Sequence, residues 1–174
     1  RVPHYYEGKL EGDVLLDGKS VSDTPLYDLA AMVGSVFQNP KSQFFNVDTD
    51  SELAFACENL GYPQEDILKR IDRTVSDYHI EDLMGRSVFA LSGGEKQKIA
   101  CASSSVLLPG IMVLDEPSSN LDMAAIDDLR QVLSLWKKQG KTILIAEHRL
   151  YYLHDLADRV LYVKDGEIER EYTP

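Results

Sequence analysis

Two short motifs in the middle of the chain have the residue types and spacing of a site that handles phosphate. Residues 91–97 read LSGGEKQ, and residues 111–116 read IMVLDE. The first motif predicts a glycine-rich turn at the start of a helix, where backbone N–H groups and the helix dipole attract anions. The second predicts a buried strand that ends in two acids. Together they indicate half of a site that hydrolyses a nucleotide.

The acids of the second motif stand where a ligand would bind. A continuous apolar run suits a strand buried on both faces, and open α/β sheets bind ligands at the carboxyl ends of their strands. Asp115 is placed to hold Mg²⁺, usually through water, and Glu116 is placed to polarise an attacking water. Such a strand with an acidic loop, or a plain Ser92 helix cap, also occurs without a site, so the specificity comes from the two motifs together.

A phosphate loop of the form Gly-x4-Gly-Lys-Ser/Thr should precede these motifs, because its amides cradle phosphate and its lysine neutralises the charge. The only Gly-Lys-Ser triplet in the sequence begins at Gly18, and Asp13 stands where the loop needs its first glycine. The triplet also follows the pattern of a strand and turn. We therefore interpret it as a hairpin turn and expect the loop to be missing from these 174 residues.

The elements that must position the motifs alternate between strands and helices at both ends of the chain. This alternation predicts an α/β fold with a largely parallel sheet. The hydrophobic patterns and turn residues predict a hairpin over 8–21, a short helix over 26–32, a strand over 34–37, buried strands over 111–114 and 142–146, a long helix over 123–139, and a closing hairpin of 160–163 with 167–171.

The middle of the chain is entirely helical in pattern. The predicted helices cover 49–60, 64–78, 80–84 and 94–105, and a further helix covers 150–156, in which Tyr151 and Tyr152 are expected to pack in the core. We therefore assign 1–48 and 106–174 to an α/β core that is incomplete at its N-terminus. Residues 49–105 form an inserted helical subdomain that ends in the motif 91–97.

Composition restricts the classes of function. The chain has 29 acidic and 18 basic residues, which argues against a surface for nucleic acid. It contains neither a signal peptide nor an apolar run of membrane-spanning length, so a membrane role would come through a partner. Cys57 and Cys101 match no metal-binding spacing, and we expect two reduced, buried thiols.

Five motifs in the family's order make the chain resemble the nucleotide-binding domain of ABC transporters. The matching segments are 36–38 for the Q-loop, 91–97 for the signature, 111–116 for the Walker B strand and catalytic glutamate, 119–122 for the D-loop and 146–148 for the switch histidine. Further segments, 38–45, 58–61 and 147–150, are similar to energy-coupling-factor ATPases. Those subunits power the uptake of vitamins, cobalt or nickel.

The resemblance implies a role for each residue of the chain's own ATP site. Gln38 would contact Mg²⁺ and the attacking water and would sense the membrane partner. Asp115 would support Mg²⁺, and Glu116 would act as the base or position the water. His148 would contact the γ-phosphate.

The signature would serve a different nucleotide. Ser92, Gly93, Gly94 and Glu95 would bind the ATP held by an opposing subunit, and Asp122 would couple the two halves of the dimer. The implied protein is an ABC-type ATPase with a P-loop NTPase core that uses ATP and Mg²⁺. It would pair with a second ABC ATPase domain, identical, different or in tandem, and with a transmembrane coupling subunit at the cytoplasmic face of the membrane. The helical subdomain would dock that subunit near residues 38–45.

In this family the hairpin that contains Gly18 lies downstream of the phosphate loop and of an aromatic residue that stacks on adenine. We therefore expect the chain to lack roughly the first 40 residues of its domain. Without the loop, these residues alone are expected to bind ATP poorly, to hydrolyse it negligibly and to expose apolar surface.

Three alternative functions differ in what they require of the sequence. A DNA-repair or chromosome-type ABC ATPase needs a long coiled coil between Gln38 and Ser92, and only 54 positions separate them. A soluble non-transport ABC protein, associated with translation or repair, stays open as the alternative. A degenerate regulatory module is disfavoured by the intact Glu116 and His148.

Overall fold

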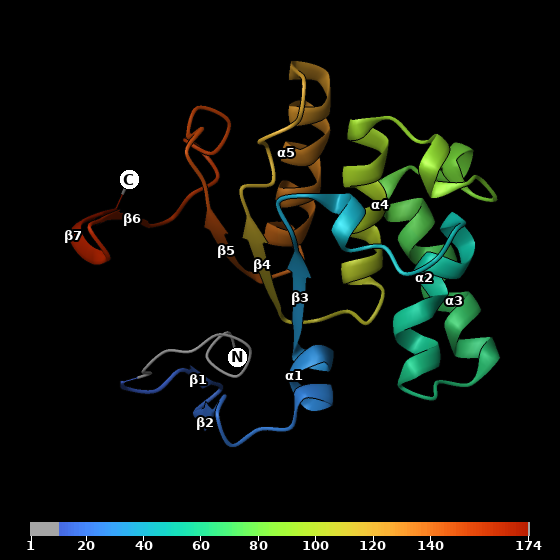
Figure 1. Cartoon of the computed structure of the whole chain (residues 1–174), viewed down its shortest axis with the longest axis horizontal. Helices are drawn as coiled ribbons and strands as arrows, with labels where there is room; N and C mark the ends of the chain where they lie inside the picture. The colour runs from blue at the N-terminus through green and yellow to red at the C-terminus, as the bar shows by residue number, and fades with distance from the viewer. Residues whose placement is uncertain (1–10, 174) are drawn as a thin grey trace.

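The computed structural model describes residues 11–173, with a parallel sheet at the centre, helices packed beside it and one antiparallel hairpin near each end of the chain (Figure 1). The strands are β1 (Leu15–Leu16), β2 (Lys19–Ser20), β3 (Val33–Val36), β4 (Ile111–Asp115), β5 (Thr142–Ala146), β6 (Val160–Lys164) and β7 (Glu167–Tyr172). The helices are α1 (Leu26–Met32), α2 (Thr49–Asn59), α3 (Gln64–Tyr78), α4 (Gly93–Ser105) and α5 (Met123–Lys138), with short 3-10 turns η2 (Pro40–Ser42), η3 (Glu81–Leu83) and η4 (Val88–Ala90).

The central sheet has the order β3-β4-β5, and both pairings are parallel. Val36 lies opposite Leu114, and Asp115 lies opposite Ala146. The three strands therefore end at the same edge of the sheet, and the loops that leave them start side by side. The predicted α/β fold with a parallel sheet is confirmed.

The strand β5 is less buried than its apolar sequence predicts. Its residues are exposed or partly buried in alternation, and the Leu144 side chain is 59% exposed. Within residues 11–173, β5 pairs only with β4, so its second edge has no strand beside it. The prediction of a strand buried on both faces holds better for β4, whose Met112 and Leu114 are fully buried.

The predicted helix over 150–156 is wrong, because this segment forms consecutive turns. Leu153 and Leu156 donate their N–H groups to Leu150 and Leu153, three residues back. The carbonyl of Tyr152, which a helix would use internally, instead accepts from Arg130 of α5 at 2.9 Å. A contact from elsewhere in the chain thus replaces the helical bond.

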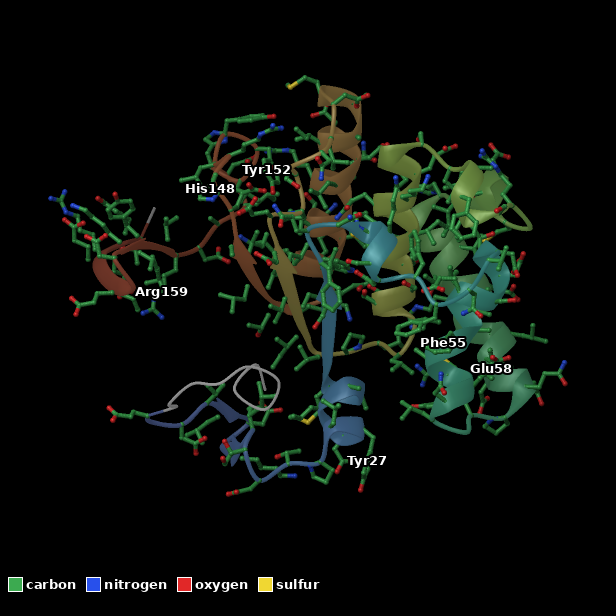
Figure 2. The ribbon with its side chains drawn as sticks, in the orientation of Figure 1. Tyr27, Phe55, Glu58, His148, Tyr152 and Arg159 are labelled. Carbon is green, nitrogen blue, oxygen red and sulfur yellow. The ribbon has the colours of Figure 1, made fainter. Side chains whose placement is uncertain are left out.

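The expectation for the two adjacent tyrosines is half correct. Tyr152 is 2% exposed and packs in the core, whereas Tyr151 is 52% exposed. Figure 2 shows Tyr152 and His148 on the loop that follows β5. The loop after β5 therefore has one buried anchor next to the exposed histidine.

Both predicted hairpins are present with the expected Asp-Gly turns. Asp17 and Gly18 have φ values of 48° and 77°, and Asp165 and Gly166 have 50° and 82°. Positive φ at both turn residues is the geometry that two-residue hairpins prefer. In the first hairpin only two residues of each strand pair, and the predicted start at 8–10 lies outside the described residues.

The larger of two apolar clusters in the described residues extends from the sheet through the helical region. It includes Val36 and Met112 of the sheet, Leu53 of α2, Ile99 of α4 and Trp136 of α5. Helix α4 packs against β3 and α5 as well as against α2 and α3. The assignment of 49–105 to a separate subdomain therefore stays a prediction. Both cysteines, Cys57 of α2 and Cys101 of α4, are free and buried, as expected.

Candidate functional site

The three residues predicted to be catalytic meet at the edge of the sheet where the strands end. Gln38 Nε2 donates to Glu116 Oε2 at 2.9 Å, and His148 Nε2 lies 3.2 Å from Glu116 Oε1. Each residue follows its strand by one or two positions, so the parallel register explains why residues 78 and 32 positions apart come together. Both carboxylate oxygens of Glu116 are thereby engaged.

The backbone of Glu116 adopts a left-handed conformation that is unusual for this residue type. Its φ is 40°. Its N–H donates to the Ala146 carbonyl at 2.9 Å, and its own carbonyl accepts from the Ser119 N–H at 3.1 Å. Such backbone costs free energy of order 1–3 kcal/mol and tends to occur at functional sites. The turn places the carboxylate between the loops that follow β3 and β5.

Asp115 is the last residue of β4, and its side chain is exposed at the same edge. Within the described residues no three acidic, histidine or cysteine side chains cluster tightly enough to hold a metal ion. Mg²⁺ commonly uses one or two carboxylates and takes its remaining ligands from phosphate and water. The oxygen donors of Asp115 and Gln38 fit this sparse kind of Mg²⁺ site.

The signature segment forms the N-terminus of α4 through a capping box. The Ser92 hydroxyl accepts from the Glu95 N–H at 3.3 Å, and the Ser92 N–H donates to the Glu95 carboxylate at 2.6 Å. Arg86 pairs with the same carboxylate at 2.8 Å. These bonds from Ser92, followed by the one from Arg86, lower the pKa of Glu95 to about 2. Glu95 thus holds Ser92 in place, and we retain its direct role in nucleotide binding only as a proposal.

The capping box makes a prediction about acid stability. Because the pKa of Glu95 is lowered from 4.5 to about 2, its stabilising contribution is complete above pH 4.5 and is lost as the pH falls towards 2. We expect Glu95→Gln to flatten the loss of unfolding free energy over this interval, measured by urea denaturation at several pH values. As a control, Glu65→Gln removes an exposed partner of Lys69 and should change stability at pH 7 by less than about 0.5 kcal/mol. An unchanged pH dependence in Glu95→Gln would contradict the prediction.

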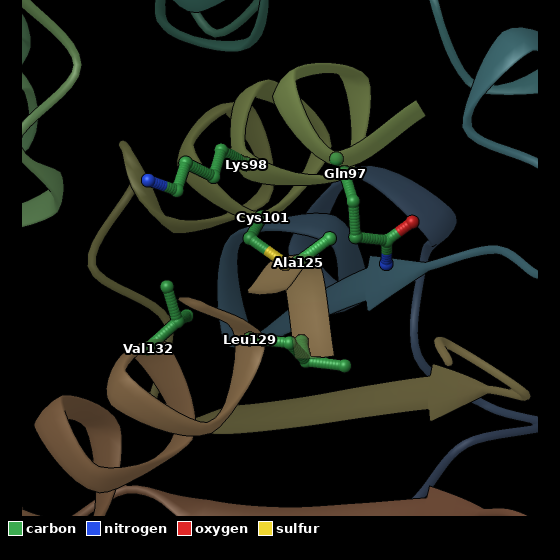
Figure 3. A pocket seen from close by; sticks show the side chains of 7 residues that line it. Gln97, Lys98, Cys101, Ala125, Leu129 and Val132 are labelled. Atoms are coloured by element: carbon green, nitrogen blue, oxygen red, sulfur yellow. The ribbon is translucent and has the colours of Figure 1, made fainter. Parts of the chain in front are cut away.

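The second signature glycine allows α4 to approach α5 closely. A Cβ atom at Gly94 would lie 2.8 Å from the Cβ of Ala125, whereas one at Gly93 would meet only the Asn120 carbonyl at 3.7 Å. Figure 3 shows Gln97 and Cys101 of α4 facing Ala125 and other side chains of α5. Gly94 therefore has a packing role in addition to the anion-binding role predicted from its type.

This contact predicts different effects for the two glycines. We expect Gly94→Ala to lower the free energy of unfolding by about 1–3 kcal/mol, because the new methyl overlaps Ala125. Gly93→Ala is the matched control and should be close to neutral. In a double-mutant cycle measured by chemical denaturation, Ala125→Gly should recover part of the loss. Equal losses of unfolding free energy in Gly94→Ala and Gly93→Ala would show that the close approach of α4 to α5 does not determine the stability effect.

A cleft of about 400 Å³ opens beside Gln38, between the loop after β3, the start of α4 and the loop after β4. It is lined by 38–41, Gly93, Lys96, Gln97, Pro117, Asn120 and Leu121. Lys96 is turned inward and donates to the Leu91 carbonyl. The predicted segments of the Q-loop, signature and D-loop thus border one space.

The loop that contains Gln38 is attached to α4 by Gln43. The Gln43 side chain accepts from the Phe37 N–H at 3.1 Å and donates to the Ala100 carbonyl at 3.1 Å and the Ser104 hydroxyl at 2.8 Å. Sequence reasoning did not assign Gln43 this function. Its amide, five residues after Gln38 in a polar loop, was the available signal.

Asp122 serves as the N-cap of α5, where its carboxylate accepts from the Ala125 N–H at 2.9 Å. The predicted D-loop residue is therefore fixed to the helix that also meets Gly94. Sequence reasoning did not identify Arg86, which pairs with Glu95, or the bonds of Glu147 to the loop after β4.

Neither Gly-Lys-Ser/Thr triplet of the described residues forms a phosphate loop. Lys19 lies in the second strand of a hairpin, and Ser20 donates to Asp13 at 2.8 Å. Lys141 precedes β5 and donates to the Pro109 carbonyl at 2.5 Å. Within residues 11–173, neither triplet therefore supplies a phosphate cradle.

Comparisons with known proteins show which family the chain resembles. A sequence model of the family described as "ABC transporter" matches residues 5–119. A protein of Treponema denticola, named as an ABC transporter ATP-binding protein, is 48% identical over 98% of this chain and 35% of its own length. One of Pyrococcus abyssi with a similar name is 38% identical over 99% of this chain and 62% of its own length. The chain thus spans about a third of the Treponema protein.

Two solved structures share the fold. CbiO1 from Clostridium perfringens, described as part of the ABC transporter complex CbiONQ, matches with a TM-score of 0.84 and 29% identity over 94% of this chain and 66% of that chain. The ATP-binding cassette MJ0796, solved as a dimer bound to ADP and Pi, matches with a TM-score of 0.78 and 24% identity over 94% of this chain and 73% of that chain. The second similarity is evidence for the fold alone.

Proposed function

The chain belongs to the ABC transporter ATP-binding family, and we propose that it is part of an ATPase subunit whose hydrolysis of ATP drives transport across a membrane. The observation that carries the proposal is the convergence of Gln38 and His148 on Glu116. The parallel sheet brings these residues together at the edge where ligands of such sheets bind.

Hydrolysis requires a group that accepts a proton and groups that orient water. Glu116 would accept the proton of the attacking water at one carboxylate oxygen. Both of its oxygens are engaged by Gln38 and His148, so water would have to replace one of these contacts. The displaced amide or imidazole would then be free to orient the water or a phosphate oxygen. When bound, Mg²⁺ would neutralise phosphate charge, with Asp115 and Gln38 as its protein contacts.

The signature side would serve a nucleotide held by a second ABC ATPase domain. The capping box exposes Ser92 and Gly93 at the N-terminus of α4, where N–H groups and the helix dipole favour phosphate. Asp122 caps the neighbouring helix, which connects this surface to the loop after Glu116. We propose that the two halves of a dimer are coupled through this loop.

The transported substrate is proposed by analogy. CbiO1 is described as part of the CbiONQ complex, which favours uptake of a transition metal such as cobalt or nickel over other cargo, with vitamins as the related class. Within residues 11–173 the structure has no helix that is both long and apolar enough to span a membrane. We propose a separate transmembrane coupling subunit as the partner, docked near residues 38–45 at the cytoplasmic face.

The 174 residues taken alone should bind Mg-ATP weakly, because they contain no Gly-x4-Gly-Lys-Ser/Thr segment. On the proposal that these 174 residues belong to a longer natural chain, the test compares the two by calorimetric titration with Mg-ATP and by phosphate release. We expect binding and hydrolysis only in the natural chain. Micromolar binding by the 174 residues would disprove the proposed need for the cradle. Absence of hydrolysis by the natural chain, alone and with its membrane partner, would disprove the ATPase function.

A further inference from the structure

The carboxylate of Glu147 connects the loop after β4 with the loop after β5. Its Oε1 accepts from the N–H groups of His148 at 2.8 Å and Arg149 at 3.1 Å. Its Oε2 accepts from the Ser118 N–H at 3.3 Å and from the Tyr152 hydroxyl at 2.8 Å. One side chain therefore binds its own loop through both oxygens and reaches the neighbouring loop through Oε2.

A second contact runs between the same loops in the opposite direction. Arg149 Nη1 donates to the Ser118 carbonyl at 3.3 Å. Both backbone polar groups of Ser118, a residue with 0% exposure, are thus bound by side chains of the loop after β5. Ser118 lies two positions after Glu116 and four before Asp122. Any movement of Glu147 must therefore also affect the loop between these two site residues.

Packing alone does not orient His148. Its side chain is 86% exposed, and within the described residues its recorded partner is Glu116. The direction of an exposed ring depends mainly on its backbone, and the Glu147 carboxylate binds the backbone N–H groups on both sides of the His148 Cα atom. Tyr152, which is almost fully buried, anchors the carboxylate in turn.

The charge of Glu147 is suited to this arrangement. Burial raises the pKa of its carboxyl, but the hydrogen bonds from Ser118, Arg149, Tyr152 and His148 more than offset this effect, so the pKa is lowered overall. An ionised carboxylate can accept all four bonds, whereas a glutamine amide accepts through only one of its two terminal atoms. Glutamine at this position can therefore keep the bonds accepted by one of the two oxygens and must lose those accepted by the other.

We propose that Glu147 is a positioning residue that makes the placement of His148 and of the loop 117–122 change together. The inference deepens the proposed function, on which it rests, by naming how the chain's own catalytic histidine communicates with the loop that would face the partner ATPase. Glu147 touches neither Glu116 nor a phosphate group in this role. It acts through the backbone of the two loops.

The first test measures amide hydrogen exchange in the natural chain, by mass spectrometry of peptides that cover 116–122 and 146–152. We expect Glu147→Gln to speed exchange about tenfold in both peptides, because hydrogen bonds to a charged acceptor are lost. Tyr152→Phe removes one bond and should give a smaller change in both. Asp48→Asn is the matched control, because Asp48 is a helix-capping carboxylate that accepts from Ser51 far from the site. It should leave both peptides unchanged.

The second test measures steady-state Mg-ATP hydrolysis by the same proteins. We expect Glu147→Gln to lower kcat about tenfold with KM changed by less than about twofold, since the residue orients groups and binds no phosphate. Asp48→Asn should change neither constant. Equal changes in kcat and KM in Glu147→Gln, or equal effects of Glu147→Gln and Asp48→Asn, would indicate a general loss of structure and overturn the proposal.

The two tests separate this inference from the proposed function. If the natural chain hydrolyses ATP and exchange rises in only one of the two peptides, the coupling is wrong although the function stands. If the natural chain does not hydrolyse ATP, the proposed function fails, and faster exchange in both peptides still supports the structural coupling by Glu147. Unchanged exchange in both peptides overturns the coupling in either case.

Discussion

Replacing Glu116 by glutamine in the natural chain is expected to lower kcat for Mg-ATP hydrolysis by about 10²–10⁴-fold, the range associated with loss of a general base. Glutamine has nearly the same shape, and its amide oxygen can still accept from Gln38 Nε2. Folding and Mg-ATP affinity should therefore stay close to those of the unmodified chain. The loss should appear in the chemical step, where the amide cannot take a proton from water.

The measurement is single-turnover phosphate release, with nucleotide binding followed separately by calorimetry. Asp158→Asn is the control, since it neutralises an exposed carboxylate that pairs with Lys137 away from the sheet edge. It should retain full kcat. A Glu116→Gln protein that keeps more than about a tenth of the kcat would remove Glu116 from the role of base. Lost nucleotide binding would instead assign Glu116 to ligand binding.

The largest stability effect is expected from Trp136→Ala, at about 3–5 kcal/mol of unfolding free energy. Trp136 has 0% exposure on α5, and its Nε1 donates to the Tyr78 hydroxyl of α3 at 2.5 Å. That hydroxyl also bonds to Ser105 of α4 at 2.5 Å. The substitution would create a cavity where the three helices meet and would remove a donor from a buried hydroxyl.

Urea denaturation followed by far-UV circular dichroism is the suitable measurement, because Trp136 is the only tryptophan of the chain and its fluorescence would be lost. Tyr78→Phe removes the hydroxyl without a large cavity and should cost about 1–3 kcal/mol. Tyr27→Ala, at an aromatic residue that is 64% exposed, should cost much less. A Trp136→Ala loss as small as that of Tyr27→Ala would show that this junction of helices does not stabilise the fold.

Local sequence was a reliable guide wherever the deciding contacts are local. Ser92 caps α4 as its place at the start of the helical pattern indicates, and the structure adds the Glu95 half of a capping box. The Asp-Gly turns of both hairpins have the expected positive φ values. Strand β4 and helix α5 end within one residue of their predicted bounds. Each of these features depends on residues that are neighbours in the chain.

Predictions that depended on distant residues were less secure. The segment 150–156 has a helical pattern, but Arg130 donates to the Tyr152 carbonyl, which a helix would use in its own hydrogen bonds. Strand β5 has an apolar sequence, but its exposure depends on what pairs with its second edge. Gly94 was interpreted as a residue for anion binding, and its closest neighbour turned out to be Ala125, 31 positions later.

The sequence by itself predicted the residues that could do chemistry and the strand ends that hold them, because motif spacing and strand patterns are properties of a single segment. The strand pattern pointed to Asp115 and Glu116, whereas Gln38 and His148 followed from the resemblance to ABC transporters. Only the tertiary structure decided that Gln38 and His148 occupy the two oxygens of Glu116, and that Glu147 ties the loops around them. Hydrogen bonds between loops depend on the register of parallel strands that are far apart in the chain. That register follows from the packing of the whole sheet, which no single segment encodes.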